Sequence, residues 1–396
     1  MQQPLLDQAK SLLPQIRQHR RYLHQYPELS FQEVNTANYI ASQLQRLGIP
    51  YQQGIAKTGL VATIQGNSST SLGLRADMDA LPIQEANGTE FDSKHAGIMH
   101  ACGHDAHTSM LLGAAEILQA KAQRGELAGT VRLLFQPSEE DWDAEGKSGG
   151  RRMVEEGALE GLSAVFGLHV DSSFYTGQLA NRSGPLLAAV DDFELTLIGK
   201  GGHAASPHQT SDVIALGALV INAVHQIVSR RLDPIEQGVI SISTIHGGRA
   251  TNVIDEKLQM SGTIRSFSPQ VRAILHKELA NAAALVRALG AEYQLKIIEG
   301  YPATINNPEA SSVVESSFKR LIGEAFKEAP MSLGSEDFSF MAKSVPGCFW
   351  LLGVRHPSWQ EEYPVHTPTF RLDEEALALG TASLCTAAEA WFTHLS

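Results

Sequence analysis

The strand–helix pattern of this chain is interrupted near Leu187 and resumes near residue 301, and few folds accommodate such an interruption. Before it, short apolar runs at 59–65, 71–76, 130–136 and 164–170 alternate with helical segments within 8–48 and at 104–122. Between 190 and 299 the order becomes β-α-β-β-α-β, which is typical of a ferredoxin-like domain. We therefore predict an α/β fold: a mixed, mainly parallel sheet sandwiched by helices, built from residues 1–187 and 301–396, with a ferredoxin-like α+β domain inserted at 188–300.

Charge and cysteine content narrow the class of protein. The chain has 31 Lys and Arg against 43 Asp and Glu, a net charge of −12, which disfavours a nucleic-acid partner. Three cysteines are too few for a disulfide scaffold and favour a reducing compartment. No apolar run reaches the roughly 18 residues of a membrane helix, and the N-terminus lacks the basic and apolar regions of a secretory signal. We expect a cytoplasmic protein without a membrane partner.

Three histidines and a cysteine gather within residues 100–107, in the order His-Ala-Cys-Gly-His-Asp-Ala-His. Cys102 and His104 are metal-ligand types separated by one glycine, which lets the backbone turn into a helix that starts there. A thiolate at a helix N-terminus is expected to have a lowered pKa, which favours metal binding. The alternative is a surface helix start with chance histidines, and so dense a cluster disfavours it.

Further metal-ligand types follow the apolar runs, where strands end and binding crevices form. Glu139 and Glu140 follow the run 130–136, and there one carboxylate can bind a cation while its neighbour takes a proton from water. His169 ends the run 164–170, and His366 lies in a proline-bounded loop. Each has a plainer alternative: a solvated acidic turn for the glutamates, a satisfied core residue for His169, and a loop residue without a role for His366.

Asp77 and Asp79 alternate at the end of the run 71–76. They can hold the second nitrogen of a metal-binding histidine or orient a ligand, although one of them could equally cap a turn. The candidate ligands offer one thiolate, three imidazoles and one carboxylate, scattered along the chain as in open catalytic sites rather than closed structural zinc sites. Five such ligands can hold two divalent ions if one ligand or a water bridges them. The candidates are Cys102, His104, Glu140, His169 and His366.

In these motifs the chain resembles the M20 metallopeptidase family, and most closely its amidohydrolase branch. That branch includes bacterial N-acyl-amino-acid and hippurate hydrolases and plant auxin-conjugate hydrolases. The resemblance covers nearly the whole chain and rests on eight blocks in the family's order. These blocks are residues 21–28, 75–82, 100–107, 136–140, 201–208, 250–254, 334–338 and 366–368.

The resemblance implies a two-metal catalytic domain that carries an inserted lid, or dimerisation, domain. The ligands would be the five candidates above, with Glu139 as general base and later acid. Cys102 stands where the peptidase branches have a bridging aspartate, and this points to the amidohydrolase branch. In the insert, His203 matches a lid histidine that steadies the oxyanion in the partner subunit's site. Asn252 matches a lid residue near the substrate, and Arg265 is a weaker candidate for gripping a carboxylate.

Two features depart from the family pattern. Asp255 stands where the family often has a proline, shortly after the Asn-Val-Ile segment. The loop after Glu140, which contains Trp142, looks several residues longer than usual. Neither departure touches a proposed ligand, but the long loop bears on the substrate pocket.

The expected activity is hydrolysis of the amide bond of small N-acyl amino acids of the N-acetyl or N-benzoyl type. It would depend on two divalent ions per chain, drawn from manganese, zinc, cobalt and nickel. A lid histidine that serves the partner's site implies a homodimer joined through the insert. Three alternatives stay open: a dipeptidase or carboxypeptidase of the same family, a hydrolase with Cys102 as nucleophile, and a non-catalytic binding protein. Glu139 argues against the last, because a binding protein needs no base beside the metal.

Overall fold

The computed structural model describes residues 3–396 and divides them into two compact units. Unit 1 comprises the chain up to Gly184 together with Ile305–Pro330 and Asp337–Ser396, and unit 2 comprises Pro185–Thr304 and Met331–Glu336. The predicted domain boundaries place 331–336 in the larger domain, whereas this segment packs with unit 2. The reason is a pair of long-range hydrogen bonds, because the Ala188 amide donates to the carbonyl oxygens of Ser332 and Gly334.

An eight-stranded mixed sheet forms the centre of unit 1, in the order β1-β2-β4-β3-β5-β16-β6-β15. The middle strands β4, β3, β5 and β16 are mutually parallel, whereas β2 is antiparallel to both of its neighbours and β6 is antiparallel to β16. The strands are β1 (Tyr51–Ile55), β2 (Gly59–Ile64), β3 (Ser71–Asp77), β4 (Thr130–Gln136), β5 (Leu162–Tyr175), β6 (Leu179–Asn181), β15 (Phe326–Glu328) and β16 (Gly347–Arg355). The predicted mixed, mainly parallel sheet is confirmed.

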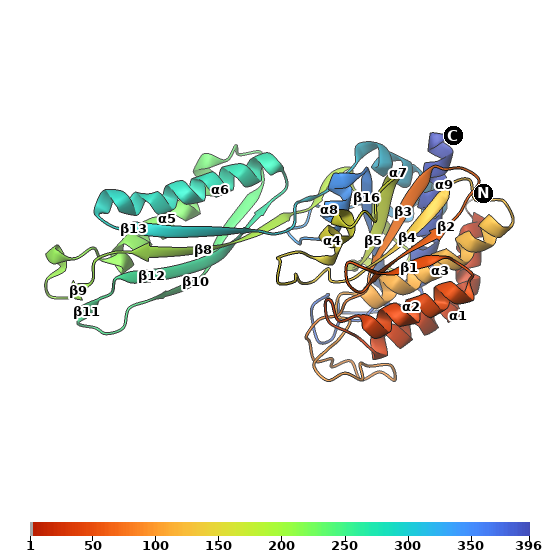
Figure 1. The fold of residues 1–396 in the computed structure, drawn as a ribbon, viewed down its shortest axis with the longest axis horizontal. Coiled ribbons are helices and arrows are strands. Elements are labelled where there is room, and N and C mark those ends of the chain that lie inside the picture. The colour runs from red at the N-terminus through yellow and green to blue at the C-terminus, as the bar shows by residue number, and fades with distance from the viewer. Residues whose placement is uncertain (1–2) are drawn as a thin grey trace. The chain divides into compact units, whose positions relative to one another are not determined.

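Helices cover both faces of this sheet, because the buried strands carry apolar side chains on both sides. Phe135, Phe166 and Trp350 point to one face and share a core with α1, α2, α3, α7 and α9. The opposite face carries α4 and α8 (Figure 1). The helices are α1 (Gln3–Gln25), α2 (Val34–Arg46), α3 (His104–Gln123), α4 (Gly149–Glu155), α7 (Pro308–Ile322), α8 (Phe338–Ser344) and α9 (Ala376–Leu395), with a 3-10 turn at Gly323–Ala325.

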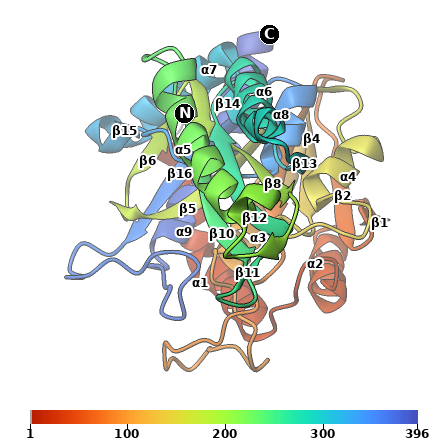
Figure 2. The same cartoon turned by 90° about the vertical axis from the view of Figure 1, so that its left-hand side faces the viewer.

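Unit 2 has the β-α-β-β-α-β order that the sequence predicts. Its antiparallel sheet has the order β10-β12-β8-β13, the arrangement of a ferredoxin-like domain. Figure 2 shows α5 and α6, which lie side by side on one face of this sheet. The elements are β8 (Ala189–Ile198), α5 (Val213–Arg231), β10 (Gly238–Gly247), β12 (Lys257–Ser266), α6 (Pro269–Ala284) and β13 (Glu292–Glu299). Smaller elements are β7 (Gly184–Leu187), β9 (Gly202–His203), β11 (Val253–Ile254), β14 (Thr304–Asn306) and the 3-10 turns Pro207–Gln209 and Leu285–Leu289.

Helix α5 is long and apolar enough to cross a membrane by length and composition, and it is the one such helix among residues 3–396. The runs of apolar residues in the sequence predict no such helix. Within unit 2, however, one stripe of α5 joins the core, with Val213, Val220, Val224 and Ile227 all buried. A core helix of a globular domain passes the same test of length and composition, so this feature is weak evidence of membrane insertion.

Candidate metal centre

The site lies where the parallel strands of unit 1 end. Strands β3 and β4 run in register to Asp77 and Gln136, so the segments that follow them, 78–80 and 137–140, leave the sheet side by side. Helix α3 begins at His104, directly after Cys102 and Gly103. Parallel strands and the helices that follow them bring their polar ends to the same edge of a sheet. Motifs that are distant in the sequence therefore meet at this edge.

Gly103 makes the turn between Cys102 and His104. Its backbone is left-handed, with φ of 90°. A Cβ built on it would lie 2.4 Å from Cγ2 of Val170, which is closer than real side chains approach. Glycine is required here for both conformation and space, and the predicted helix start after the Cys-Gly pair is confirmed.

The proton on each histidine follows from its hydrogen-bond partners. His104 Nδ1 lies 2.9 Å from the carbonyl oxygen of Asp79 and 3.1 Å from Asp79 Oδ1, both of which can only accept. His169 Nδ1 lies 2.7 Å from the carbonyl oxygen of Val170. Both rings therefore carry a proton on Nδ1, so Nε2 is the nitrogen that can bind a cation. Against the effect of burial, the carboxylates of Asp77, Asp79 and Glu140 raise the pKa of His104 to about 10, so a cation would displace a proton from its Nε2.

Five donor atoms converge beyond these rings. Cys102 Sγ lies 3.3 Å from His169 Nε2 and 3.3 Å from His366 Nε2. Glu140 Oε1 lies 3.1 Å from His366 Nε2 and 3.9 Å from His104 Nε2. Two of the groups that could hold an ion are Cys102 with His104 and His169, and Cys102 with Glu140 and His366, and a third joins His104 to Glu139 and Glu140. The five donors therefore lie close enough together to surround more than one ion.

The residues present fit divalent cations. His104 is fully buried, yet no hydrogen-bond partner for its Nε2 exists within the described chain 3–396. A buried polar nitrogen without a partner is costly, and a cation on its lone pair would remove that cost. Mixed thiolate, imidazole and carboxylate donors suit the zinc-like transition metals.

The expected lowered pKa of Cys102 is wrong for the chain by itself. Burial, followed by the nearby charges of Glu140 and Glu139, raises the pKa of this thiol well above its usual value. A place just before a helix N-terminus does not outweigh the loss of solvent and the surrounding carboxylates. The thiolate needed for metal binding therefore depends on the positive charge of the ions themselves.

Asp79 and Asp77 both hold histidine nitrogens, as expected, but they hold different rings. Asp79 accepts from His104, whereas Asp77 Oδ1 lies 2.6 Å from His107 Nδ1. His107 Nε2 in turn accepts from the Val170 amide at 2.9 Å. With both nitrogens occupied, His107 supports the site and has no lone pair left for a metal.

His169 does not end its strand. The prediction places it at a strand end, whereas it lies inside β5, which continues to Tyr175. The reason is that β16 pairs with β5 beyond this point, with Leu351 opposite His169. The pairing of β5 with β3 does stop at Gly167, two residues earlier, so His169 still lies at the edge of the β3–β5 pair.

Glu139 lies beside the donors, 7% exposed. The Asp337 amide donates to its Oε1 at 3.4 Å. Asp337 also accepts from Arg75 Nη2 at 3.0 Å and from Gln136 Nε2 at 2.8 Å, inside the protein. Asp337 has no predicted role of its own, although it lies in the block 334–338, and that block is the signal that could have found it.

The remaining predicted residues belong to unit 2. His203 is exposed on β9, and its Nδ1 accepts from the Ala205 amide at 3.0 Å, so its proton lies on Nε2, ready to donate. Asn252 is exposed next to β11, and its carbonyl oxygen accepts from the Ala204 amide at 3.1 Å. Arg265 on β12 is half-buried, with Nη1 3.5 Å from Ser335 Oγ. The loops of His203 and Asn252 are thus neighbours within unit 2.

Comparison with known proteins gives consistent results. The family model described as peptidase family M20/M25/M40 matches residues 73–390. The chain is 39% identical to thermostable carboxypeptidase 2 of Saccharolobus solfataricus, over 95% of each chain. It is 38% identical to the N-acetyl-L-cysteine deacetylase of Bacillus subtilis, over 90% of this chain and 83% of the relative. The solved structure of the Bacillus subtilis YXEP protein, described as a dinuclear metal binding peptidase, superposes with a TM-score of 0.84 at 34% identity, over 97% of this chain and 99% of that one.

Proposed function

The chain belongs to peptidase family M20/M25/M40 and to its amidohydrolase branch, and from this premise we propose that it hydrolyses the amide bond of N-acyl amino acids with the help of two divalent ions. The observation that carries the proposal is the convergence of five donor atoms beside a buried carboxylate, Glu139. A relative named as an N-acetyl-L-cysteine deacetylase supports the choice of an acylated amino acid as substrate.

Two ions would be held by Cys102, His104, Glu140, His169 and His366. When bound, such ions polarise the amide carbonyl and lower the pKa of a water molecule. The ions proposed are manganese, zinc, cobalt or nickel. The remaining steps belong to the protein's own side chains.

Glu139 acts as the proton carrier. Its carboxylate takes a proton from the attacking water as that water adds to the acyl carbon, and later delivers the proton to the leaving amine. The Asp337 amide, 3.4 Å from Glu139 Oε1, restrains the carboxylate for both transfers. This division of labour leaves Glu140 free to bind a cation while its neighbour moves the proton.

Unit 2 would complete the site in a homodimer joined through this unit. His203 donates from Nε2 to the developing oxyanion in the partner's site. Asn252 and Arg265 hold the substrate, with the guanidinium suited to its carboxylate. Light scattering tests the assembly, and a fully active monomer would remove this part of the proposal.

A second candidate is a carboxypeptidase acting on peptides. The similarity to thermostable carboxypeptidase 2 supports it. The two activities differ in substrate rather than in catalytic groups, so a panel separates them. N-acetyl- and N-benzoyl-amino acids are compared with unblocked dipeptides and longer peptides.

The deciding experiment combines metal analysis with that panel. Plasma mass spectrometry on the purified protein should find about two ions per chain. Activity should vanish on chelation and return with Mn²⁺ or Zn²⁺, and N-acyl amino acids should be cleaved fastest. Activity that ignores chelation but is lost on thiol alkylation would instead support Cys102 as a nucleophile.

A further inference from the structure

Glu33 lies where strained segments of unit 1 meet. Five non-glycine residues among 3–396 have a left-handed backbone. Two of them donate their amides to Glu33, and two more form the pair that precedes a third donor, Thr58. The amides of Phe31 (φ 60°) and Ser138 (φ 46°) both donate to Glu33 Oε1, at 3.0 and 2.8 Å. Thr58 follows the left-handed pair 56–57 and donates to Glu33 Oε2 at 2.6 Å. Strain of this kind persists only where surrounding contacts hold it, and it concentrates at functional sites.

The carboxylate of Glu33 does not serve the helix that it precedes. Glu33 occupies the N-cap position of α2 but makes no side-chain capping bond to that helix. Glu28 takes that part instead, since its carboxylate accepts from the amides of Asn35 and Thr36 at 3.1 and 2.8 Å. The fully buried side chain of Glu33 therefore stabilises something other than α2.

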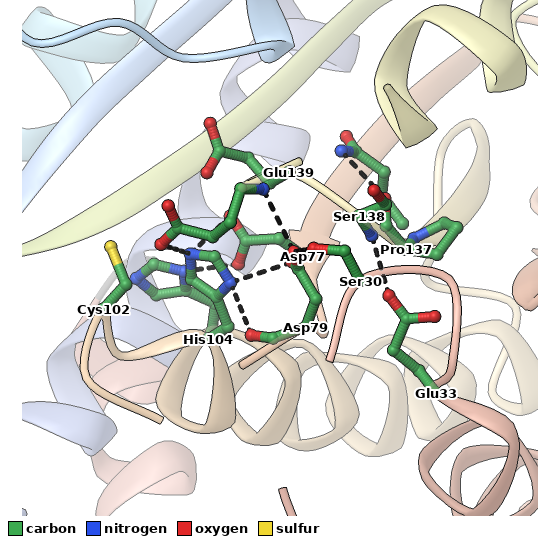
Figure 3. Close-up of polar contacts among 12 residues, drawn as sticks. Ser30, Glu33, Asp77, Asp79, Cys102, His104, Pro137, Ser138 and Glu139 are labelled. Atoms are coloured by element: carbon green, nitrogen blue, oxygen red, sulfur yellow. Dashed lines mark hydrogen bonds and ion pairs between the residues drawn. The ribbon is translucent and has the colours of Figure 1, made fainter. Parts of the chain in front are cut away.

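The Ser138 turn sets the direction of the two glutamates that follow it. Its amide donates to Glu33 (Figure 3), and its carbonyl oxygen accepts from the Gly149 amide at 2.9 Å. Two residues further on, the Glu140 amide donates to Asp79 Oδ2 at 3.0 Å. The backbone is thus fixed on both sides of Glu139.

The loop that carries Glu33 reaches this turn a second time. Ser30 Oγ donates to Asp79 Oδ2 at 2.7 Å (Figure 3). The same oxygen accepts from the Glu140 amide. The short segment 30–33 therefore contacts the Ser138 turn directly, through Glu33, and indirectly, through Ser30 and Asp79.

We propose that Glu33 is a positioning residue that keeps Ser138 left-handed, so that Glu139 faces the reacting water while Glu140 faces the metal site. The assignment of Glu139 as the proton carrier rests on the proposed function; the hold on the turn does not. A side chain held in place for catalysis gains orientation that a loose one loses.

The test compares E33A and E33Q with the control E28A, which removes a carboxylate from the same loop that contacts only α2. With metal in excess, E33A should lower kcat about tenfold or more and leave KM within about threefold. E33Q should stay within about threefold of wild type, because its amide oxygen still accepts from both backbone amides and the Thr58 hydroxyl can turn to accept. E28A should lower thermal stability and leave kcat unchanged.

Amide hydrogen exchange measures how firmly the Ser138 turn is held in the absence of metal and substrate. In the metal-free protein, E33A should speed amide exchange in a peptide spanning residues 135–142, whereas E33Q and E28A should not. A double variant, E33A with E139Q, should be no slower than E139Q alone if Glu33 acts through Glu139.

The two proposals fail separately. Unchanged exchange and unchanged kcat in E33A would overturn the role of Glu33, even if E139Q is inactive. Additive losses in the double variant, or activity of E33A restored by excess metal, would also overturn it. Wild-type turnover of E139Q would instead overturn the proposed base, whereas the exchange result would still report on the turn.

Discussion

Replacing Asp79 by asparagine tests how the chain prepares its metal ligands. Asp79 receives three donors on two oxygens: His104 Nδ1 at 3.1 Å on Oδ1, and Ser30 Oγ at 2.7 Å and the Glu140 amide at 3.0 Å on Oδ2. Asparagine of the same shape keeps one accepting oxygen and gains an NH₂ group. In either orientation of the asparagine amide, its NH₂ group faces another hydrogen-bond donor, which is either His104 Nδ1 or the Glu140 amide.

The favoured orientation keeps oxygen toward His104, because the opposite one would move the proton of His104 to Nε2 and block the lone pair that faces the site. The NH₂ group then meets the Glu140 amide, whose hydrogen bond is lost, and the bond to His104 loses its charged acceptor. Bonds to charged groups contribute about 1.5–3 kcal/mol, so we take a loss of about 2 kcal/mol. This is about a 30-fold weaker metal affinity, since 1.4 kcal/mol is tenfold.

The measurement is competition for Zn²⁺ or Mn²⁺ with a chromophoric chelator, with thermal melts to show that the variant is folded. The matched control is Asp212→Asn at the N-cap of α5, where asparagine caps as well as aspartate. Metal affinity of D79N within about threefold of wild type would refute the argument, because changes around a ligating histidine commonly cost 10–100-fold. An equal loss in the control would refute its specificity.

Three further predictions follow from the same geometry. Glu139→Gln should lower kcat at least about 100-fold with metal content unchanged, measured by steady-state kinetics and plasma mass spectrometry; retained turnover would contradict the proton-carrier role. Asp337→Asn weakens a buried partner of the Arg75 guanidinium and should lower the free energy of unfolding by roughly 3 kcal/mol in urea titrations, whereas an unchanged midpoint would show that Asp77 suffices. Burial raises the pKa of Glu33 from 4.5 to about 7, so the folded state binds this proton more tightly than the unfolded state. The stability of wild type relative to E33Q should therefore fall by roughly 1–3 kcal/mol as pH rises from 5 to 8, and a rise over that window would contradict the argument.

Much of the site was accessible from local sequence because its constraints are local. The glycine in Cys-Gly-His predicts a turn into a helix, and Gly103 makes that turn with a left-handed backbone, φ 90°. Glutamates that follow an apolar run predict a strand end, and β4 ends at Gln136, just before them. Likewise, the β-α-β-β-α-β order of unit 2 follows from periodicity alone, because each element buries one apolar stripe against its neighbours.

The choice among the histidines, by contrast, belongs to the tertiary structure. His107 and His169 both lie beside Cys102 and His104, yet the backbone of Val170 forms opposite kinds of hydrogen bond with them. Its amide occupies Nε2 of His107, whereas its carbonyl oxygen fixes the proton of His169 on Nδ1 and frees Nε2. Spacing in the sequence cannot show which nitrogen a backbone group 63 residues away will occupy.

The role of Glu33 likewise depends on the tertiary structure. The helical pattern gives Glu33 no separate role, whereas in the structure it stands at the N-cap of α2 and its carboxylate accepts from the amide of Ser138, 105 residues along the chain. The order of residues is enough to predict which chemical groups are present, the turns that join them and the elements that carry them. Tertiary structure alone decided which lone pairs stay free and which carboxylates are buried together, because those outcomes depend on hydrogen bonds and desolvation between segments that meet only when the sheet forms.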